Sequence, residues 1–303
     1  MDNAGRIIAV TGAAGYVGSR LLQELEGEES LSKVIAIDLH SLPHPVHNIM
    51  ALRMDVTHQL GDALHDLKVN GLVHLASNLD VGRNRRDEED VTIANIKGVH
   101  SVLQACRSAR VDNLIYLSSH TVYGPHRDNP VPITEEAHLR PMPEFRYSVD
   151  KALAEQAIQE FATQNPGVRV TILRSCTVLG PSADSHAASA FLKPVLFGIW
   201  GMDPSWQFVH EEDIARLLTL LVMEPHSGIY NVAGDGIVAY SHIARLARRR
   251  LLRLPSWLAQ AVVQATWALN IQRESPSQVL DFSRYPIVLS TGKLKKEIDF
   301  RFK

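Results

Sequence analysis

Tyr147 and Lys151 stand four residues apart, a spacing that places both side chains on one face of a helix. A phenol has a reference pKa of about 10, which is too high for efficient proton transfer at neutral pH. A neighbouring ammonium group favours the phenolate and lowers that pKa, so the pair could act as a general acid and base. The same spacing arises by chance in many chains. Whether the pair is functional therefore depends on where it lies in the fold.

Three glycines near the N-terminus form a second candidate site. Gly12, Gly15 and Gly18 follow the apolar run 7–10 and lead into a helical pattern of leucines over 18–25. This order of strand, turn and helix offers free N–H groups to an anion such as a pyrophosphate. The spacing is G-x-x-G-x-x-G and not the common G-x-G-x-x-G, so an ordinary glycine-rich turn is the alternative.

Further candidate polar residues lie at the ends of two predicted strands. Asp38 ends an apolar run 20 residues beyond Gly18, where a doubly wound fold places an acid on the adenosine ribose. A carboxylate at that point would repel a 2′-phosphate, so the sequence favours NAD over NADP. Ser118, Ser119 and Thr121 lie at the end of another strand, and hydroxyls there would face the cofactor crevice.

Apolar runs and helical patterns alternate along the chain, which predicts a doubly wound, parallel α/β sheet of the Rossmann type. A smaller, mainly helical C-terminal lobe is expected to follow it. We assign residues 1–175, rejoined by about 207–238, to an NAD-binding domain and 176–303 to a substrate-binding lobe. The predicted strands cover 7–10, 34–38, 49–54, 71–77, 113–119, 168–174, 208–210 and 229–234, and the predicted helices 18–25, 91–109, 147–161, 214–222 and 240–271, the last divided by Pro255.

Composition limits the possible partners and compartment. The chain has 303 residues, 45% hydrophobic and 21% charged, with a net charge of -2, so we expect neither nucleic acid nor an anionic membrane as a partner. Its 14 histidines are scattered, which predicts no metal site. Cys106 and Cys176 are expected to be reduced thiols. With no apolar run of the roughly 18 residues that a bilayer span needs and no room for a signal peptide, we expect a cytoplasmic protein.

These motifs occur in one order, and together they resemble the extended short-chain dehydrogenase/reductase family, also called the NAD-dependent epimerase/dehydratase family. The resemblance covers residues 7 to about 234 and becomes general beyond that point. The segments that carry it are Thr11–Gly18, Asp38, Asp55–Val56, His74–Ala76, Asn95, Ser118–Gly124, Tyr147 with Lys151, and Phe208–His210.

The resemblance implies a role for each matching residue. Tyr147 would be the catalytic acid and base, Ser119 would hydrogen-bond the substrate oxygen, and Lys151 would hold the nicotinamide ribose and lower the Tyr147 pKa. Asn95 would support the Lys151 side, and the helices 91–109 and 147–161 would pair in a homodimer. The expected cofactor-binding residues are Gly12, Gly15, Tyr16, Val17, Gly18, Asp38, Asp55, Val56, Leu75, Ala76, Ser77, Asn95, Ser118, Tyr147, Lys151 and Ser175, and the expected substrate contacts are Thr121, Thr177 and Trp206.

Departures from the family pattern bear on the substrate. Trp206 and Gln207 stand where members that act on nucleotide sugars usually carry Arg-Asp, and Thr177 replaces an asparagine. The loss of charge-assisted phosphate contacts favours an NAD(H)-dependent oxidoreductase that interconverts a secondary alcohol and a carbonyl. The alternatives are a nucleotide-sugar 4-epimerase or dehydratase with tightly bound NAD, whose phosphate partner could be another arginine, and a non-catalytic NAD-binding regulatory protein.

The C-terminal third carries two further patterns. Residues 258–269 are apolar, which favours core or dimer packing over an apolar substrate wall. Arg248, Arg249 and Arg250 form a basic cluster that we expect to face solvent on a helix.

Overall fold

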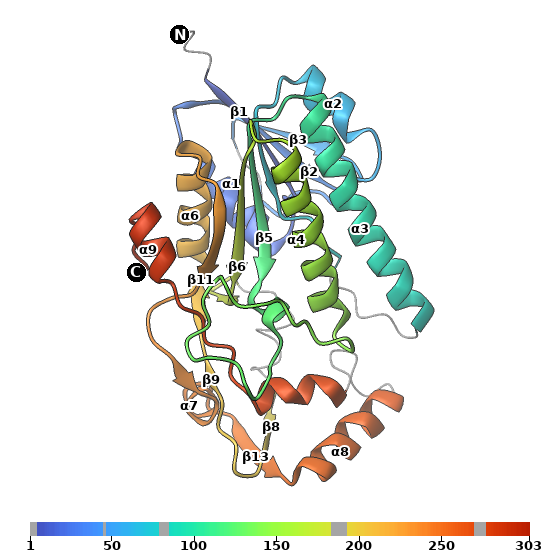
Figure 1. Cartoon of the computed structure of the whole chain (residues 1–303), viewed down its shortest axis with the longest axis vertical. Helices are drawn as coiled ribbons and strands as arrows, with labels where there is room; N and C mark the ends of the chain where they lie inside the picture. The colour runs from blue at the N-terminus through green and yellow to red at the C-terminus, as the bar shows by residue number, and fades with distance from the viewer. Residues whose placement is uncertain (1–4, 45–46, 79–84, 183–192, 270–276) are drawn as a thin grey trace.

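The computed structural model describes residues 5–44, 47–78, 85–182, 193–269 and 277–303. Its centre is a seven-stranded parallel sheet between two layers of helices (Figure 1), which confirms the predicted α/β class. In spatial order the strands are β11 (Gly228–Val232), β6 (Arg169–Ser175), β5 (Asn113–Ser119), β4 (Gly71–His74), β1 (Arg6–Thr11), β2 (Leu31–Asp38) and β3 (Ile49–Arg53).

The strand order reverses next to β1. From β1 the chain builds β2 and β3 on one side, and it then returns to place β4, β5 and β6 on the other side. In such sheets the crevice at the carboxyl ends of the two central strands is the usual ligand site. The fold therefore places the candidate site at the ends of β1 and β4.

Two helical layers cover the sheet. On one face, α1 buries Gly18, Leu21, Leu22 and Leu25, the face that the sequence predicts. The layer on that face consists of α1 (Tyr16–Leu25), α6 (Glu211–Met223) and α9 (Gly292–Ile298), and the opposite layer of α2 (Leu60–Asp66), α3 (Arg85–Ser108) and α4 (Arg146–Gln164).

Helix α3 begins at Arg85, six residues before the predicted start at 91, so part of the charged run before Val91 belongs to the helix. Its first turns extend past the strand tips (Figure 1). Because no sheet lies beneath that part, Ile93 is 49% exposed while Val99 and Leu103 farther along are buried.

The second lobe mixes short strands with helices. It contains three two-stranded sheets, β10–β7, β12–β9 and β13–β8. The bounds are β7 (Thr177–Leu179), β8 (Val195–Ile199), β9 (Ser205–Trp206), β10 (Phe208–His210), β12 (Val238–Ala239), β13 (Arg250–Leu254), α7 (Tyr240–Leu246), α8 (Ser256–Ala268) and the 3-10 helix η2 (Ser277–Ser283). Another 3-10 helix, η1 (His120–Tyr123), directly follows β5 in the sheet domain.

The prediction of helix over 240–271 is wrong between α7 and α8. There the chain forms β13, which pairs in parallel with β8 and places Arg250 at a strand start. The partner strand lies about fifty residues earlier in the chain, and a local pattern cannot report hydrogen bonds to such a distant segment.

Both cysteines are free and buried. Burial raises the pKa of the Cys106 thiol to about 12, so the thiol is unreactive at neutral pH. Among the described residues, no helix combines the length and hydropathy required to cross a bilayer. The same part of the chain contains no group of three or more His, Cys, Asp or Glu arranged to hold a metal ion.

A buried ion pair joins α4 to the sheet. Glu155 and Arg174 expose 0% and 3% of their side chains, and Arg174 Nη2 donates to Glu155 Oε2 at 2.7 Å. Glu155 also accepts from Ser118 Oγ, and Arg174 Nη1 donates to the Tyr123 hydroxyl at 2.8 Å. Tyr123 in turn donates to Asn231 Oδ1 at 2.8 Å. The network therefore connects α4, β5, β6, η1 and β11.

Substitution of Glu155 tests how much this network contributes to the free energy of unfolding. Glu155→Gln should lower the free energy of unfolding by about 3 kcal/mol or more, because Arg174 would keep a buried charge without a counterion. Urea denaturation measures the change. The control Glu160→Gln, on the exposed side of the same helix, should stay within about 0.5 kcal/mol of the unmodified chain. Equal effects of the two substitutions would contradict the assignment.

Candidate active site

The carboxyl ends of five strands bring the predicted residues to one edge of the sheet. Thr11, Asp38, His74, Ser119 and Ser175 are the last residues of β1, β2, β4, β5 and β6. The register pairs the end of β1 with that of β4, and the end of β5 with that of β6. Residues up to 164 positions apart in the chain therefore line one crevice.

The glycine turn packs tightly against the end of β4. Gly12 has a φ of +71°, and a Cβ added there would stand 2.6 Å from the backbone nitrogen of Ala76. A Cβ at Gly18 would stand 2.1 Å from the Gly12 carbonyl oxygen. The atoms nearest to this added Cβ thus belong to the glycine turn itself. Both glycines are required sterically.

The start of α1 fits a pyrophosphate. Gly15 is its N-cap, no side chain caps the helix, and its first turn carries no acidic residue. The backbone N–H groups of Tyr16, Val17 and Gly18 thus have no competing side-chain acceptor, which is the arrangement that binds phosphate oxygens.

Asp38 supports the turn from the neighbouring strand. Its Oδ2 accepts from the Ala14 amide at 2.9 Å, and its Oδ1 accepts from the His40 amide at 2.9 Å. His40 Nδ1 also lies 3.3 Å from Oδ1, whereas Oδ2 has only the Ala14 amide and can still accept a ribose hydroxyl. Asp38 is placed to hold the turn and to meet the ribose.

The other predicted cofactor residues lie along the same edge. Asp55 accepts from both the amide and the hydroxyl of Thr57 at 2.8 Å, and the amide hydrogen bond lowers the pKa of Asp55. The Leu75 amide donates to the Thr11 carbonyl at 3.1 Å, which continues the ladder beyond β4 and leads into Ala76 and Ser77.

Asn95 is hydrogen-bonded to α4, the helix that carries Tyr147 and Lys151, through Asp150. Its Nδ2 donates to Asp150 Oδ2 at 3.0 Å, and its Oδ1 accepts from the Asn78 amide at 2.8 Å. The predicted support for the Lys151 side therefore passes through the residue next to Lys151. The other oxygen, Asp150 Oδ1, is buried without a hydrogen-bond partner among the described residues.

Lys151 is almost fully buried. Its Nζ donates to the Leu117 carbonyl at 2.9 Å and lies 4.8 Å from the centroid of the Tyr116 ring. Burial lowers the pKa of Lys151 to about 8, although the carboxylates of Glu155 and Asp150 oppose the shift.

Tyr147 is linked to Ser119. A hydrogen bond from Ser119 lowers the pKa of the Tyr147 phenol, but burial has the larger effect and raises it to about 12. Lys151 Nζ donates to the Leu117 carbonyl and lies 5.8 Å from the centroid of the Tyr147 ring, and the expected lowering of the Tyr147 pKa by Lys151 stays a prediction. Ser119 Oγ also accepts from the amide and hydroxyl of Thr121 at 3.2 and 3.0 Å.

His74 is a buried neighbour of this group that the motif analysis did not assign. Its Nδ1 lies 2.7 Å from Thr11 Oγ1, and its ring stacks on Tyr116 with centroids 5.6 Å apart. Burial lowers the pKa of His74 to about 3, so the ring is neutral at neutral pH. Because β4 pairs His74 with Tyr116, an aromatic row runs from Thr11 to Lys151.

Glu211 is a second residue that sequence reasoning missed. Tyr16 donates to Glu211 Oε2 at 2.6 Å, and the Ser182 hydroxyl donates to Glu211 Oε1 at 2.7 Å. These bonds connect the nucleotide turn to the segment that follows β7. In the sequence, the acidic run 211–213 is typical of a capped helix start, so it gives no sign that the Glu211 carboxylate points inward.

The predicted substrate contacts lie in the second lobe or beside it. Trp206 stacks on Phe208 and Tyr240, with ring centroids 6.4 and 6.2 Å apart. Thr177 pairs with Phe208 in the register of β7 and β10. Gln207 is occupied elsewhere, because its side-chain amide accepts from the Leu289 amide at 2.7 Å and donates to the Leu289 carbonyl at 3.3 Å.

Comparison with known proteins decides the family. The model of the NAD-dependent epimerase/dehydratase family matches residues 8–233. The chain belongs to this family. Membership confirms the resemblance, the enzyme class and the cofactor that the motifs indicate. The individual roles of Ser119, Tyr147, Lys151 and the remaining site residues stay predictions.

Three relatives show the extent of the similarity. An uncharacterised protein of Mycobacterium tuberculosis is 24% identical over 305 residues, which cover 98% of this chain and 80% of that protein. A UDP-glucose 4-epimerase of Yersinia enterocolitica is 28% identical over 82% of this chain and 73% of its own. The structure of a Thermus thermophilus UDP-glucose 4-epimerase in complex with NAD has a TM-score of 0.75 at 21% identity, over 98% and 94% of the two chains. The last likeness confirms the fold.

The steric role of Gly18 can be measured directly. Gly18→Ala should push the first turn of α1 away from Gly12, and a misplacement worth about 1.4 kcal/mol weakens NAD binding tenfold. Titration calorimetry with NAD tests this. The control is Gly167→Ala, since no atom lies within 4 Å of the added methyl group. NAD binding by Gly18→Ala as tight as by the control would refute the steric argument.

The buried ammonium of Lys151 predicts a pH dependence of stability. Its pKa is about 8 in the folded chain against an ordinary value of 10.5, so between these pH values the unfolded chain binds more protons. The free energy of unfolding should therefore rise from pH 8 to pH 10.5, by at most about 3 kcal/mol from this group. Lys151→Met should remove that slope in urea titrations, and Lys97→Met, at an exposed lysine, should keep it. A retained slope in Lys151→Met would exclude this origin.

Proposed function

We propose that this protein is an NAD(H)-dependent oxidoreductase that interconverts a secondary alcohol and a carbonyl, with Tyr147 as acid and base. The observation that carries the proposal is the convergence of Ser119, the last residue of β5, with Tyr147 and the buried Lys151 on α4, whose Nζ donates to the Leu117 carbonyl of the same strand. Unrelated motifs would not be expected to lie together near the point where the strand order reverses.

The residues divide the work as follows. NAD, when bound, accepts or returns the hydride. Ser119 and Tyr147 hold the substrate oxygen by hydrogen bonds, and in carbonyl reduction the neutral Tyr147 hydroxyl gives its proton to that oxygen as the alcohol forms. In the reverse direction the Tyr147 phenolate takes the hydroxyl proton of the alcohol as the carbonyl forms. Thr121 donates to Ser119 Oγ, which orients the Ser119 hydroxyl hydrogen away from Thr121 and leaves it for Tyr147 or substrate. Lys151 holds the ribose and contributes its positive charge.

The proposed cofactor preference is NAD rather than NADP. Asp38 supports this preference because its carboxylate is fixed beside the turn by the Ala14 amide and would repel a 2′-phosphate. A structural neighbour from T. thermophilus holds NAD, which agrees with the preference.

A nucleotide-sugar 4-epimerase or dehydratase is the second candidate, and the names of the relatives favour it. The first step, oxidation of a substrate hydroxyl with Tyr147 as acid and base, would be the same as in the oxidoreductase. Against it, Gln207 is engaged with Leu289, and the guanidinium of Arg174 is buried on Glu155, so neither can bind a diphosphate. The third alternative, a regulatory protein that only binds NAD, would not need the Ser119–Tyr147 hydrogen bond.

We further propose a division of labour within the chain. Residues 1–175 with about 207–238 would bind NAD, and most of 176–303 would contact the substrate. The packing of Leu294 and Ile298 against the core beside β11 assigns α9 to the first of these units.

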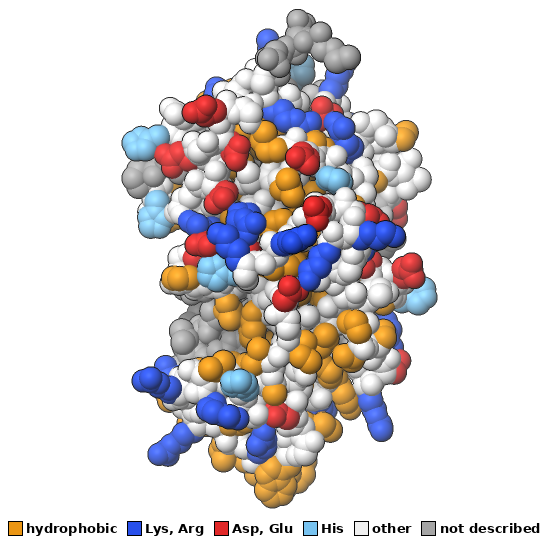
Figure 2. All heavy atoms as spheres, turned by 90° about the vertical axis from the view of Figure 1, so that its left-hand side faces the viewer, with side chains coloured by type: hydrophobic (Ala, Val, Ile, Leu, Met, Phe, Trp, Pro, Cys, Tyr) orange, Lys and Arg blue, Asp and Glu red, His pale blue; other side chains and the backbone are white. Residues whose placement is uncertain are grey.

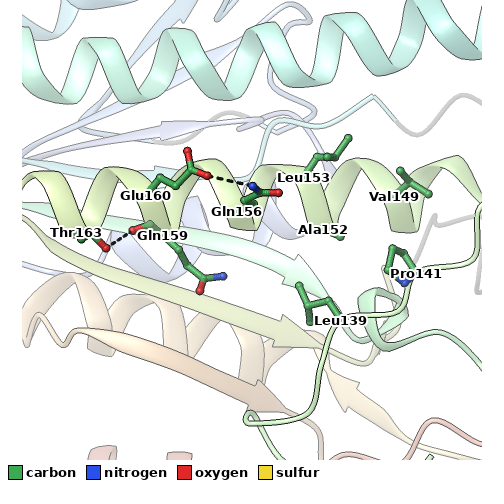
Figure 3. A pocket seen from close by; sticks show the side chains of 9 residues that line it. All are labelled: Leu139, Pro141, Val149, Ala152, Leu153, Gln156, Gln159, Glu160 and Thr163. Atoms are coloured by element: carbon green, nitrogen blue, oxygen red, sulfur yellow. Dashed lines mark hydrogen bonds between the residues drawn. The ribbon is translucent and has the colours of Figure 1, made fainter.

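A cytoplasmic homodimer is the proposed assembly. The two free cysteines support the compartment, and the exposed apolar side chains of Ile93 on α3 and Leu153 on α4 support pairing through these helices. A groove of about 520 Å³ runs along α4 beside Leu139 and Pro141 (Figure 3). Its position on the outer side of α4 suits a helix from a second copy.

The decisive test of the catalytic proposal is Tyr147→Phe. The variant should bind NADH as tightly as the unmodified chain and lose about a hundredfold or more in turnover, the usual range for a lost general acid or base. An NADH-linked screen of alcohols, ketones and UDP-sugars identifies the substrate. Tyr285→Phe is the control and should retain activity. Full turnover by Tyr147→Phe would refute the assignment.

The same screen separates the two enzyme hypotheses. An oxidoreductase consumes or produces NADH in proportion to product. An epimerase or dehydratase converts substrate with no net change in NADH and purifies with NAD bound.

A further inference from the structure

Exposed apolar side chains concentrate in the second lobe. Of the twelve large hydrophobic side chains that are exposed in the described part of the chain, eight lie between residues 197 and 269. Figure 2 shows hydrophobic side chains gathered at the end of the molecule that this lobe forms, with Lys and Arg beside them. The eight are Phe197, Trp200, Met202, Ile237, Leu246, Leu252, Trp257 and Leu269.

Helix α8 accounts for part of this surface. It carries no charged residue, and Figure 1 places it beyond the strand tips, at the far end of the lobe. The sequence predicts core or dimer packing for 258–269, but among the described residues only Ala259 is buried in α8, and Trp257 is 69% exposed. Exposure of a large apolar side chain such as Trp257 on the solvent side of a helix is unfavourable in water, so a contact surface is the expected explanation.

The apolar side chains continue onto the β13–β8 ribbon. Leu252 pairs with Phe197 in the parallel register, so both side chains lie on the same face, and both are exposed. The Trp200 amide donates to the Leu254 carbonyl at 3.0 Å, which brings Trp200 next to the start of α8. Together these residues form one patch.

Positive charge surrounds the patch. Arg245, Arg248, Arg250 and Arg253 are exposed, and the chain contains no Asp or Glu from Gly236 to Arg273. Arg253 has a single acidic neighbour from another segment, Asp203, at 3.5 Å. The net charge of -2 for the whole chain hides this local excess, which is why composition predicts no anionic membrane as a partner.

We propose that this aromatic–arginine patch, formed by Phe197, Trp200, Leu252 and Trp257 with Arg245, Arg248 and Arg250, binds the surface of an anionic lipid bilayer. Tryptophan favours the headgroup level of a bilayer, where its ring is half in hydrocarbon. Arginines are attracted by the negative surface potential, and they can extend their heads to the lipid phosphates. Such binding is peripheral and needs no spanning helix.

Charge argues against a second copy of the chain as the occupant. A two-fold contact places the same surface on both sides, so the arginines of one patch would face those of the other. The proposal is independent of the catalytic assignment, because it rests on residues outside the crevice that holds Tyr147.

The experiment is co-sedimentation of the full chain with vesicles. Phosphatidylcholine vesicles that contain phosphatidylglycerol should bind it, pure phosphatidylcholine vesicles should bind it weakly, and salt should weaken the binding. Trp200→Ser with Trp257→Ser should abolish binding, while Leu39→Ser, an exposed leucine outside the lobe, should not. Arg245→Gln with Arg248→Gln should weaken partitioning about fivefold for each arginine removed.

The arginine control is matched to the test. Arg110→Gln with Arg301→Gln removes two exposed arginines elsewhere, and Arg110 has the same left-handed backbone as Arg248, with φ of 57° and 54°. NAD affinity and circular dichroism show whether each variant is folded. Equal binding to both vesicle types, equal loss in the control, retention by the tryptophan variant, or dimerisation through the patch in light scattering would each overturn the proposal, as would preferential binding to nucleic acid.

Discussion

The structure depends on the buried ion pair between Glu155 and Arg174. Two charges removed from water are tolerated only when each is neutralised and hydrogen-bonded, and here Ser118, Tyr123 and Asn231 complete the network. Together with the pair these groups come from five elements, α4, β5, β6, η1 and β11, so the network fixes their relative positions. Because Ser118 precedes Ser119 and Glu155 follows Lys151 by one helical turn, the same network orients the proposed catalytic residues.

Burial at this edge shifts the pKa values of two residues on which the proposed chemistry depends. The pKa of Lys151 falls to about 8 and that of Tyr147 rises to about 12, since both charged forms lose hydration. Ser119 opposes this effect on the phenol by a hydrogen bond. A site in which charged forms are disfavoured until partners arrive is one that cofactor and substrate can activate by binding.

Two separate regions of the molecule have surfaces suited to different partners. The carboxyl edge of the sheet carries the nucleotide turn, Asp38 and the Tyr16–Glu211 contact, all suited to a small polar ligand. The far end of the second lobe exposes Trp200 and Trp257 among arginines, which suits a larger, amphipathic surface. An enzyme held in this way on a bilayer would meet substrates that are only slightly soluble in water.

The sequence by itself determined the sheet, the glycine turn, the face of α1 and the set of Ser119, Tyr147 and Lys151, because strand and helix periodicity and turn chemistry are local properties. Only the tertiary structure decided what depends on distant partners. Arg250–Leu254 became a strand because β8 offered hydrogen bonds, and Glu155 and Glu211, which read as ordinary helix carboxylates, turned inward to Arg174 and Tyr16. The Tyr147 pKa likewise followed from burial, which the spacing of residues along a helix does not report.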